Sequence, residues 1–485
     1  MESHRRHVPK TCLLPGLAVL LPLTILTPLP SLADEGVPSG MEDLFAEPPR
    51  DAPADAAAPI PGLDASLEDM FAEDSPPEAT RAAVPFTGFF QSELAYSTES
   101  PSHWSKFRNL LEIGTGGDLD NGMRWKLSGR LSYDAVFDLE DDFYPKAVRN
   151  DRRHEAWLHE TYLDVPAGDW ALRLGRQHII WGEMVGLFFA DVVSARDMRQ
   201  FVAQDFELLR IPQWAVRAEH FGESVHLDAI WIPYMTYDEI GRPGDDFFRL
   251  PVPPEPGYGV AVLGEEKPAN TLSNSAFGLR LSRMVNGWDL TGFYYRSMDA
   301  APAFRRTVMG PTLVFQPEHF RIQQFGTTLS KDIGRSLILK AEAVYTLDKR
   351  FSVTDLNDSD GLVKQDMLDY VVGLEHTFDS GARINVQVFQ RWFPDHVDSM
   401  IPDEVESGYS LYATTEWLNG RLRPELTWIQ GFNQGDWLAR PKLNWHFAPN
   451  WRAALGADIF DGRPTTLLGQ FDGADRVYAE LRYSY

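Results

Sequence analysis

Charged side chains that could bind a solute gather in one mixed stretch, residues 172–214, among long apolar runs. Arginine binds carboxylates and phosphates through paired N–H groups, and nearby acids hold its guanidinium in place. This chemistry is reversible recognition of a charged solute. The residues that we select as a narrow zone, within a loop over 180–212, are Glu183, Asp191, Arg196, Arg199, Asp205 and Arg210.

Other motifs that could carry chemistry do not have the spacing that their chemistry needs. His154 and His159 flank a glutamate, but three residues separate it from the second histidine, and a strand would point the two rings to opposite sides. The acidic run 355–361 lacks the glycine that a calcium loop has at its sixth position. The only cysteine is Cys12, so thiolate metal sites in a mature chain are excluded. The sequence predicts no enzyme, no metal and no cofactor.

The elements that must position these residues are strands, and the clearest one ends the chain. Between Arg476 and Tyr485, apolar and polar side chains alternate, so one face of a strand is apolar and aromatic. This pattern is typical of a strand that closes a membrane barrel, with lipid outside and water inside. An edge strand of a soluble sandwich is the alternative.

Similar alternation recurs from Phe86 onward and predicts an all-β, transmembrane antiparallel barrel of about 18 strands. One missed hairpin would change the count to 16 or 20. In the third segment, we expect Phe137 on the apolar face. The predicted strands are 86–96, 104–115, 123–137, 154–165, 169–179, 213–222, 224–237, 275–286, 287–297, 320–331, 335–348, 367–379, 381–393, 407–418, 421–431, 436–447, 450–460 and 474–485.

Every second connection between these segments is short and carries turn residues, such as Asn286-Gly287 and Asn419-Gly420. The others are mostly long, as in 180–212 and 238–274. Bacterial outer-membrane barrels have short periplasmic turns and longer external loops. We therefore expect both chain ends on the periplasmic side of a Gram-negative outer membrane.

Lipid disfavours charge, so the polar face of each strand is expected to line the pore. On that face we count fifteen bases and seven acids, which predicts a basic lumen. The bases are Arg124, Lys126, Arg130, Arg173, Arg217, Lys340, Arg383, Arg391, Arg421, Arg423, Arg440, Lys442, Arg452, Arg476 and Arg482. The acids are Asp134, Glu219, Glu342, Glu416, Glu425, Asp458 and Glu480. A tube lined with positive charge concentrates anions.

The N-terminal part differs from the barrel in composition. Residues 1–33 have the basic start, apolar run and small-residue site of a secretory signal peptide. Residues 34–84 are rich in Pro and Ala and carry thirteen acids against two bases, which predicts a disordered linker before a barrel over 85–485. The net charge of −25 makes the protein a poor nucleic-acid binder.

The linker contains a duplicated heptad, Met41-Glu-Asp-Leu-Phe-Ala-Glu47 and Leu67-Glu-Asp-Met-Phe-Ala-Glu73. Each copy could form a short amphipathic helix with two apolar anchors. A docking motif for a periplasmic partner, a plug that enters the pore, and a spacer duplicated by chance all remain open. The anchors are Leu44, Phe45, Met70 and Phe71.

The stretch 172–214 also resembles a known family. Its segments Gly175-Arg-Gln, Trp181-Gly-Glu, Asp191-Val-Val-Ser-Ala-Arg-Asp and Arg210-Ile-Pro-Gln-Trp214 look like those of proteobacterial outer-membrane barrels classed as a domain of unknown function. The resemblance implies an outer-membrane location, a periplasmic companion and an inner-membrane transporter of the resistance-nodulation-division type. A more distant resemblance is to alginate-export porins, whose Arg-rich pores pass an acidic polysaccharide.

Taken together, these patterns predict an outer-membrane channel, surrounded by lipid, for an anionic or amphiphilic solute. The loop 180–212 would fold inward and narrow the pore, whereas an apolar cap over the mouth is the alternative. Two other functions remain open. The protein could dock a periplasmic or inner-membrane export system through its acidic linker, or it could be a barrel enzyme.

Overall fold

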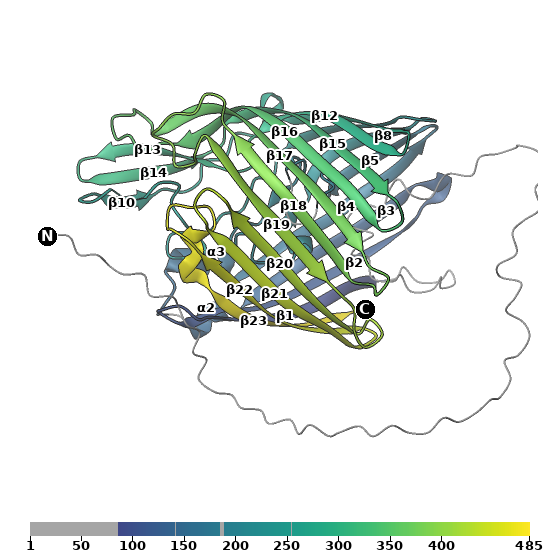
Figure 1. Cartoon of the computed structure of the whole chain (residues 1–485), viewed down its shortest axis with the longest axis horizontal. Helices are drawn as coiled ribbons and strands as arrows, with labels where there is room; N and C mark the ends of the chain where they lie inside the picture. The colour runs from purple at the N-terminus through teal and green to yellow at the C-terminus, as the bar shows by residue number, and fades with distance from the viewer. Residues whose placement is uncertain (1–85, 141, 185–188, 254) are drawn as a thin grey trace, which may run out of the picture. The chain divides into compact units, whose positions relative to one another are not determined.

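The alternating segments form eighteen antiparallel strands that close into a β-barrel, as predicted (Figure 1). The computed structural model describes residues 86–140, 142–184, 189–253 and 255–485. The barrel strands are β1 (Phe86–Ser97), β2 (His103–Asp118), β3 (Arg124–Asp134), β4 (His154–Ala167), β5 (Trp170–Gln177), β8 (Gln213–Phe221), β9 (His226–Tyr234), β11 (Ala276–Val285), β12 (Trp288–Met298), β15 (Arg321–Ile333), β16 (Leu337–Ser352), β17 (Leu362–Thr377), β18 (Arg383–Trp392), β19 (Val405–Thr414), β20 (Leu422–Gly431), β21 (Trp437–Ala448), β22 (Trp451–Asp461) and β23 (Arg476–Ser484).

The first and last strands close the ring. β1 pairs with β23 from Phe89 opposite Ser484 to Ser97 opposite Arg476. Backbone bonds in both directions between Gly88 and Tyr485, at 3.2 and 3.0 Å, extend the seam to the last residue. Closure leaves no unpaired strand edge, which a sheet in lipid requires.

Connections at one end of the barrel are short, and those at the other end are mostly long. At the short-turn end, Asn286 and Gly287 take φ values of 53° and 76°, which the tight hairpin between β11 and β12 requires. The opposite end carries the long connections and is the loop end. This division follows the alternation of loop lengths in the sequence.

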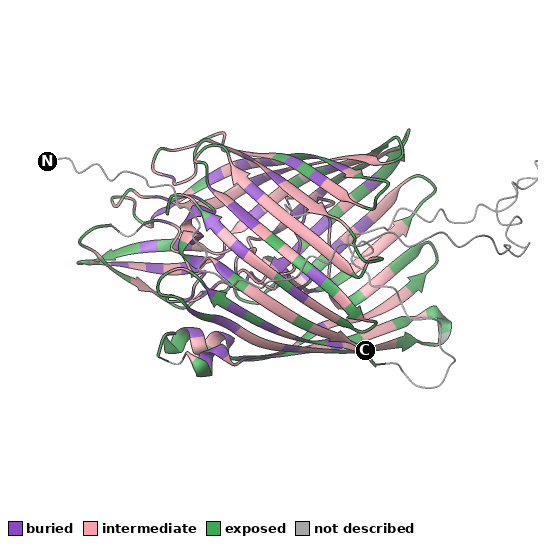
Figure 2. Cartoon of the chain, turned by 60° about the horizontal axis from the view of Figure 1, so that its bottom comes forward, coloured by how far each residue is buried: buried purple, intermediate pink, exposed green. Residues whose placement is uncertain are grey.

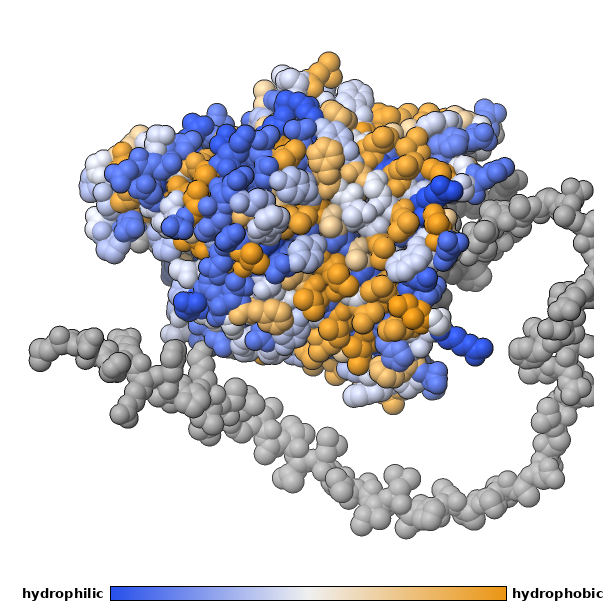
Figure 3. All heavy atoms as spheres, turned by 45° about the horizontal axis from the view of Figure 1, so that its top comes forward, coloured by the Kyte–Doolittle hydropathy of each residue, from blue (hydrophilic) through white to orange (hydrophobic). Residues whose placement is uncertain are grey.

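Along many strands, buried residues alternate with intermediate or exposed ones, which indicates a more buried inner face and a more exposed outer face (Figure 2). On β3, Leu131 is exposed and its neighbour Arg130 is buried. Apolar residues gather on the outer face over the strands, and hydrophilic residues gather over the loop end (Figure 3). Among the described residues, no helix has both the length and the apolar character needed to cross a membrane.

The loop end carries structure that the strand pattern did not predict. The third predicted strand ends at Asp134, and Phe137 is buried in the short helix α2 (Val136–Leu139) instead of facing lipid. Phe137 packs there with Tyr144 and Val148.

The turns and connections of the barrel contain further short elements. They are η1 (Asp120–Gly122), α3 (Lys146–Arg152), β6 (Ala195–Arg196), α4 (Phe206–Leu209), β7 (Arg210–Ile211), β10 (Gly259–Val262), η2 (Leu272–Asn274), β13 (Ala303–Met309), β14 (Thr312–Glu318) and η3 (Gly469–Ala474).

The predictions made for residues 1–85 lie outside the described part of the chain. They are the signal peptide over 1–33, the linker over 34–84 and the docking anchors Leu44, Phe45, Met70 and Phe71. Each stays a prediction.

Candidate functional site

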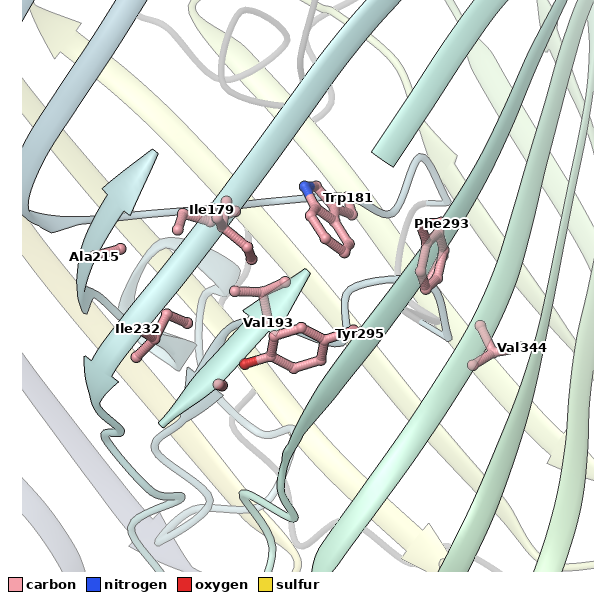
Figure 4. Packing of buried hydrophobic residues seen from close by; sticks show 11 residues of the cluster. Ile179, Trp181, Val193, Ala215, Ile232, Phe293, Tyr295 and Val344 are labelled. Carbon is pink, nitrogen blue, oxygen red and sulfur yellow. The ribbon is translucent and has the colours of Figure 1, made fainter. Parts of the chain in front are cut away.

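Within the connection between β5 and β8, residues 178–184 and 189–212 pack against inward-facing side chains of the strands; we call these residues the inward segment. Trp181 is fully buried, with its ring 5.3 Å from Phe293 and 6.0 Å from Tyr295, both on β12 (Figure 4). Its indole nitrogen donates to Asp228 of β9 at 3.0 Å. Because Phe293, Tyr295 and Asp228 are buried on the inner face, Trp181 lies inside the ring of strands.

Glu342 of β16 holds the same segment through its backbone. The carboxylate accepts the N–H groups of Glu183 at 2.5 Å, Met184 at 2.9 Å and Ala190 at 2.9 Å. The side chain of Glu183 in turn accepts the hydroxyl of Thr328 on β15 at 2.9 Å. Glu342 and Thr328 are neighbours across two strands, well away from the strand ends. These contacts are at mid-depth, which an apolar cap over the mouth could not reach.

The tip of the inward segment, residues 199–207, contacts a different part of the wall. Arg199 pairs with Glu155 of β4 at 2.7 Å, and Lys442 of β21 pairs with Asp205 at 2.7 Å. Arg440 of β21 also donates to the backbone carbonyl of Val202 at 2.7 Å. The cavity left between the tip and this wall has a volume of about 10 Å³, the space of one water molecule.

The inward segment therefore contacts strands on separate sides of the ring. The first part reaches β9, β12, β15 and β16, and the tip reaches β4 and β21. Only a chain inside the ring can contact all of them. The structure thus places the inward segment across the interior of the barrel.

Of the six residues selected from the sequence as a narrow zone, three come together and three lie apart. Asp191 accepts the guanidinium of Arg210 at 2.8 Å, and its backbone carbonyl accepts a bond from Arg196 at 3.0 Å. Asp205 lies between Lys442 and Arg452, the latter at 3.7 Å. Glu183 and Arg199 also lie apart, each held by the wall.

Neighbouring bases keep two acids of the inward segment charged. Burial alone would raise the pKa of Asp197, but the guanidinium of Arg199 at 2.8 Å outweighs it and lowers the pKa to about 2. Burial likewise opposes ionisation of Asp205, but Lys442 and Arg452 hold its pKa well below the usual range. At neutral pH, Asp205 is therefore held to the wall by a full charge, and Asp197 holds Arg199 within the segment.

The predicted pore-lining bases lie beside acids of neighbouring strands or of the inward segment, with one exception. Arg421 is exposed in the turn before β20. The pairs of the others are Arg124–Asp164 (3.6 Å), Lys126–Glu160 (2.5 Å), Arg130–Glu112 (2.6 Å), Arg173–Asp164 (2.6 Å), Arg217–Asp228 (3.0 Å), Lys340–Glu375 (4.0 Å), Arg383–Glu375 (3.8 Å), Arg391–Asp369 (2.7 Å), Arg423–Glu416 (2.7 Å), Arg440–Asp458 (2.7 Å), Lys442–Glu480 (3.0 Å), Arg452–Asp205 (3.7 Å), Arg476–Asp458 (2.7 Å) and Arg482–Glu207 (2.9 Å).

The count of fifteen bases against seven acids is incomplete, because it missed acids that face the same way across the strands. Glu93 illustrates the error, because Lys106 and Arg108 of the next strand both pair with it at 2.9 Å. Residues that lie directly opposite each other on paired strands face the same side, so these acids could have been found once the register was known. The missed acids are Glu93, Glu112, Glu155, Glu160, Asp164, Asp228, Asp369, Glu375 and Glu406.

In many of these pairs, the side chain of the base is more exposed than the side chain of its acid. The side chain of Arg124 is 68% exposed and that of Asp164 is 18% exposed. Lys126 and Glu160 differ in the same direction, at 42% and 15%. The pairs Arg391–Asp369 and Arg440–Asp458 follow the same order. The order is reversed at the tip of the inward segment, as in Lys442–Asp205, and in the wall pairs Arg130–Glu112 and Arg423–Glu416.

A cavity of about 330 Å³ opens beside the most exposed bases at the short-turn end. Arg124, Lys126 and Arg173 line it together with Asp164 and Tyr162. The guanidinium of Arg173 lies 4.1 Å from the centre of the Tyr162 ring, which orients it toward this space. A small anion that enters the cavity would meet these three bases and the carboxylates of Asp118 and Asp164.

The described residues also bear on the arrangement of ligands that a metal site needs. No group of three or more His, Cys, Asp or Glu side chains in this part of the chain could hold a metal ion. His159 contacts His178 at 3.3 Å instead of forming a site with His154.

A closed antiparallel barrel with an apolar outer face and an inward segment is the fold of porin-like β-barrels. Solved structures with this fold include Acinetobacter baumannii OccAB4, at 8% identity and a TM-score of 0.50, covering 82% of this chain and 97% of that one. Pseudomonas aeruginosa OccK8 (OprE) has 10% identity and a TM-score of 0.49 over 82% and 97%. Salmonella typhi OmpF, solved in complex with daunomycin, has 10% identity and a TM-score of 0.40 over 83% and 97%.

No curated protein matches the chain. Residues 102–485 match DUF1302, described as a protein of unknown function, and the chain belongs to this family. The predicted resemblance to a family of unknown function is thereby confirmed. The more distant resemblance to alginate-export porins, the periplasmic companion and the inner-membrane transporter stay predictions.

Proposed function

We propose that this barrel is an outer-membrane channel for a small anionic or amphiphilic solute, narrowed by the inward segment. The observation that carries the proposal is the difference in exposure within the wall ion pairs. Nearly equal numbers of acids and bases would give little selectivity if both were equally accessible. Because the acids are more buried in pairs such as Arg124–Asp164 and Lys126–Glu160, a passing solute meets cationic groups first.

The same arrangement supports passage as well as binding. Each wall base of the ion pairs given above has an acidic partner, so it can bind an anion only in competition with that partner. Competition keeps each contact weak, and a row of weak sites allows a solute to enter and to leave. Partly buried rings of the inward segment, such as Phe189 at 6.3 Å from Phe389, would contact the apolar part of an amphiphile.

Conductance across a planar lipid bilayer with a salt gradient tests this proposal. The refolded full chain is expected to give an open current whose reversal potential reports anion preference. Cation preference would overturn the assignment of solute charge. The complete absence of current, with a correctly folded barrel, would overturn the channel itself.

The orientation of the barrel is part of the proposal. The loop end would face the exterior, and both chain ends would lie in the periplasm. Cysteine substitution at Met309, in the hairpin between β13 and β14, is expected to react with an impermeant maleimide on intact cells. Substitution at Leu418, in the short turn between β19 and β20, is expected to react only after the outer membrane is opened. The reverse result would invert the orientation.

Docking of a periplasmic partner is a second role that the duplicated heptads support by sequence alone. A cross-link between residues 34–84 and a periplasmic protein, lost when Leu44, Phe45, Met70 and Phe71 are changed to alanine, is the expected result. An unchanged cross-link would remove the heptads from this role.

A further inference from the structure

Three arginines lie near the loop end of neighbouring strands, on the outer face of the barrel. Arg296 on β12 shares its face with the exposed Leu290, and the residues next to it face inward and are buried. Arg321 is the first residue of β15. Arg296 lies opposite Gln323 of β15, so Arg321 is its diagonal neighbour, two residues along the same face. Arg350 on β16 follows on the next strand of the ring. Cross-strand neighbours of this kind are within reach of long side chains.

None of the three guanidinium groups pairs with a carboxylate in the described part of the chain. Arg296 lies over the Phe277 ring at 5.7 Å, and Arg350 lies over the Phe320 ring at 5.4 Å. Arg321 donates to the backbone carbonyl of Ser273 and to the side-chain oxygen of Asn274. This differs from the inner wall, where almost every base has an acidic partner.

Aromatic side chains form a row directly below these arginines. Tyr294 pairs with Phe325 across β12 and β15, and their rings are 4.9 Å apart. Phe277 lies 6.0 Å from Tyr294 on the other side. Such rings mark the level at which hydrocarbon gives way to head groups. Leu272, 77% exposed, lies beside the backbone that binds Arg321.

We propose that Arg296, Arg321 and Arg350 form a binding site for the phosphate groups of a membrane glycolipid, the lipopolysaccharide of the outer leaflet. Guanidinium groups bind phosphate through paired N–H donors. The apolar row beneath would pack against the acyl chains while the head group lies at the arginines. The site rests on the proposed orientation, with the loop end outward, but not on the channel activity.

Binding to the refolded full chain in a zwitterionic detergent tests the site. The probes are bisphosphorylated lipid A, the same lipid after enzymatic dephosphorylation, phosphatidylglycerol and inorganic phosphate. Lipid A is expected to bind and to raise the midpoint of thermal unfolding, and the dephosphorylated lipid is not. Equal binding of the dephosphorylated lipid, displacement of lipid A by a similar concentration of inorganic phosphate, or tighter binding of phosphatidylglycerol would each overturn the proposal.

Substitutions locate the site. Because each base near an anionic lipid surface contributes about a fivefold factor, the variant R296Q/R321Q is expected to bind lipid A about 25-fold more weakly. The matched control R283Q/K331Q removes two outward bases on β11 and β15 at the short-turn end and is expected to bind like the wild type. R296K/R321K keeps both charges and is expected to retain most of the binding.

A folding check accompanies each variant, since folded barrels migrate differently from heated ones on gels. If R296Q/R321Q does not fold, R296K/R321K and the single variant R296Q still decide the question. Lipid A affinity that is the same in all folded variants would overturn the assignment to these arginines.

Discussion

The carboxylate of Glu342, in the wall strand β16, accepts the backbone N–H of Ala190 at 2.9 Å. It also accepts the N–H groups of Glu183 and Met184 from the same inward segment. E342A would leave these donors without their acceptor inside the barrel, at a cost of about 1–3 kcal/mol for each buried group. We expect lower stability toward urea and a larger, noisier single-channel conductance, because the segment is released.

The control for Glu342 is E425Q. Glu425 accepts a bond from Asn444 at 3.0 Å on the adjacent strand, and none of its described hydrogen bonds involves the inward segment. We expect this variant to leave the channel noise unchanged. Equal noise in the two variants would contradict the role given to Glu342.

Asp458 connects two arginines of the wall. It is fully buried, and Arg440 and Arg476 each donate to it at 2.7 Å. D458N leaves two buried guanidinium groups without a counter-charge, so we expect a loss of about 3–5 kcal/mol in the free energy of unfolding. Equilibrium unfolding in urea measures this loss.

Asp164 offers a matched control, because it is also shared by two arginines, Arg124 and Arg173. It borders the open cavity at the short-turn end, where water replaces a lost partner. We expect D164N to cost less than about 1 kcal/mol. Losses of similar size in D458N and D164N would mean that burial does not set the strength of these pairs.

The barrel could be predicted because its signals are local. Alternation along Arg476–Tyr485 and the turn residues Asn286 and Gly287 need no knowledge of distant contacts, and they identified both strands and turns. The pattern failed at Phe137, where apolar side chains turn inward under a helix at the loop end. Periodicity does not distinguish a side chain that faces lipid from one that fills a small core.

The site could be predicted only in part, because its geometry depends on which strands become neighbours. Lys442 reads as a free lumen base in the sequence, but it pairs with Asp205, which is 237 residues away along the chain. Glu93 lies only thirteen residues from Lys106. It was still missed, because the alternation of its strand did not tell us which face points into the lumen. Register, rather than composition, decides the balance of charge in the lumen.

Gly175 in β5 lies just before the inward segment and has a φ of 132°, which L-residues rarely adopt. A Cβ at this position would approach the carbonyl oxygen of Thr161 to 2.2 Å. We expect G175A to distort the pairing of β4 with β5 and to lower the thermal midpoint. G292A is the control, because a Cβ there meets nothing within 4 Å. Equal midpoints for both would refute this prediction.

The contribution of Asp238, at the loop end, to the stability of the protein is expected to depend on pH. Burial raises its pKa to about 6, from an ordinary value of 3.8. The folded state therefore binds this proton more tightly than the unfolded state. The contribution of Asp238 to stability is complete below about pH 4, falls as the pH rises to about 6, and stays low above it.

D238N removes this penalty, and its side-chain oxygen can still accept the N–H of Arg196. We expect the variant to match the wild type near pH 4 and to be more stable at pH 7.5, by at most about 3 kcal/mol. Urea midpoints at the two pH values measure the difference. The exposed Asp398 serves as the control, and D398N is expected to follow the wild type at both. A D238N variant less stable at pH 7.5 would contradict this reading.

Substitutions in two sets of wall bases can distinguish bases that select the solute from bases that hold the inward segment. Arg124, Lys126 and Arg173 border the cavity at the short-turn end and do not contact the inward segment through the described ion pairs. R124Q/K126Q/R173Q is therefore expected to shift the reversal potential toward cations, with conductance noise unchanged.

The second set, Arg440, Lys442 and Arg452, looks equivalent in the sequence but holds the tip of the inward segment at Asp205 and Val202. Neutralising these three bases is expected to increase conductance and noise, because the tip loses its partners. Anion preference would change less than in the first set, since these bases are turned toward the segment and away from the solute. The same change of reversal potential in both sets would show that the exposure of a base does not determine which solute passes.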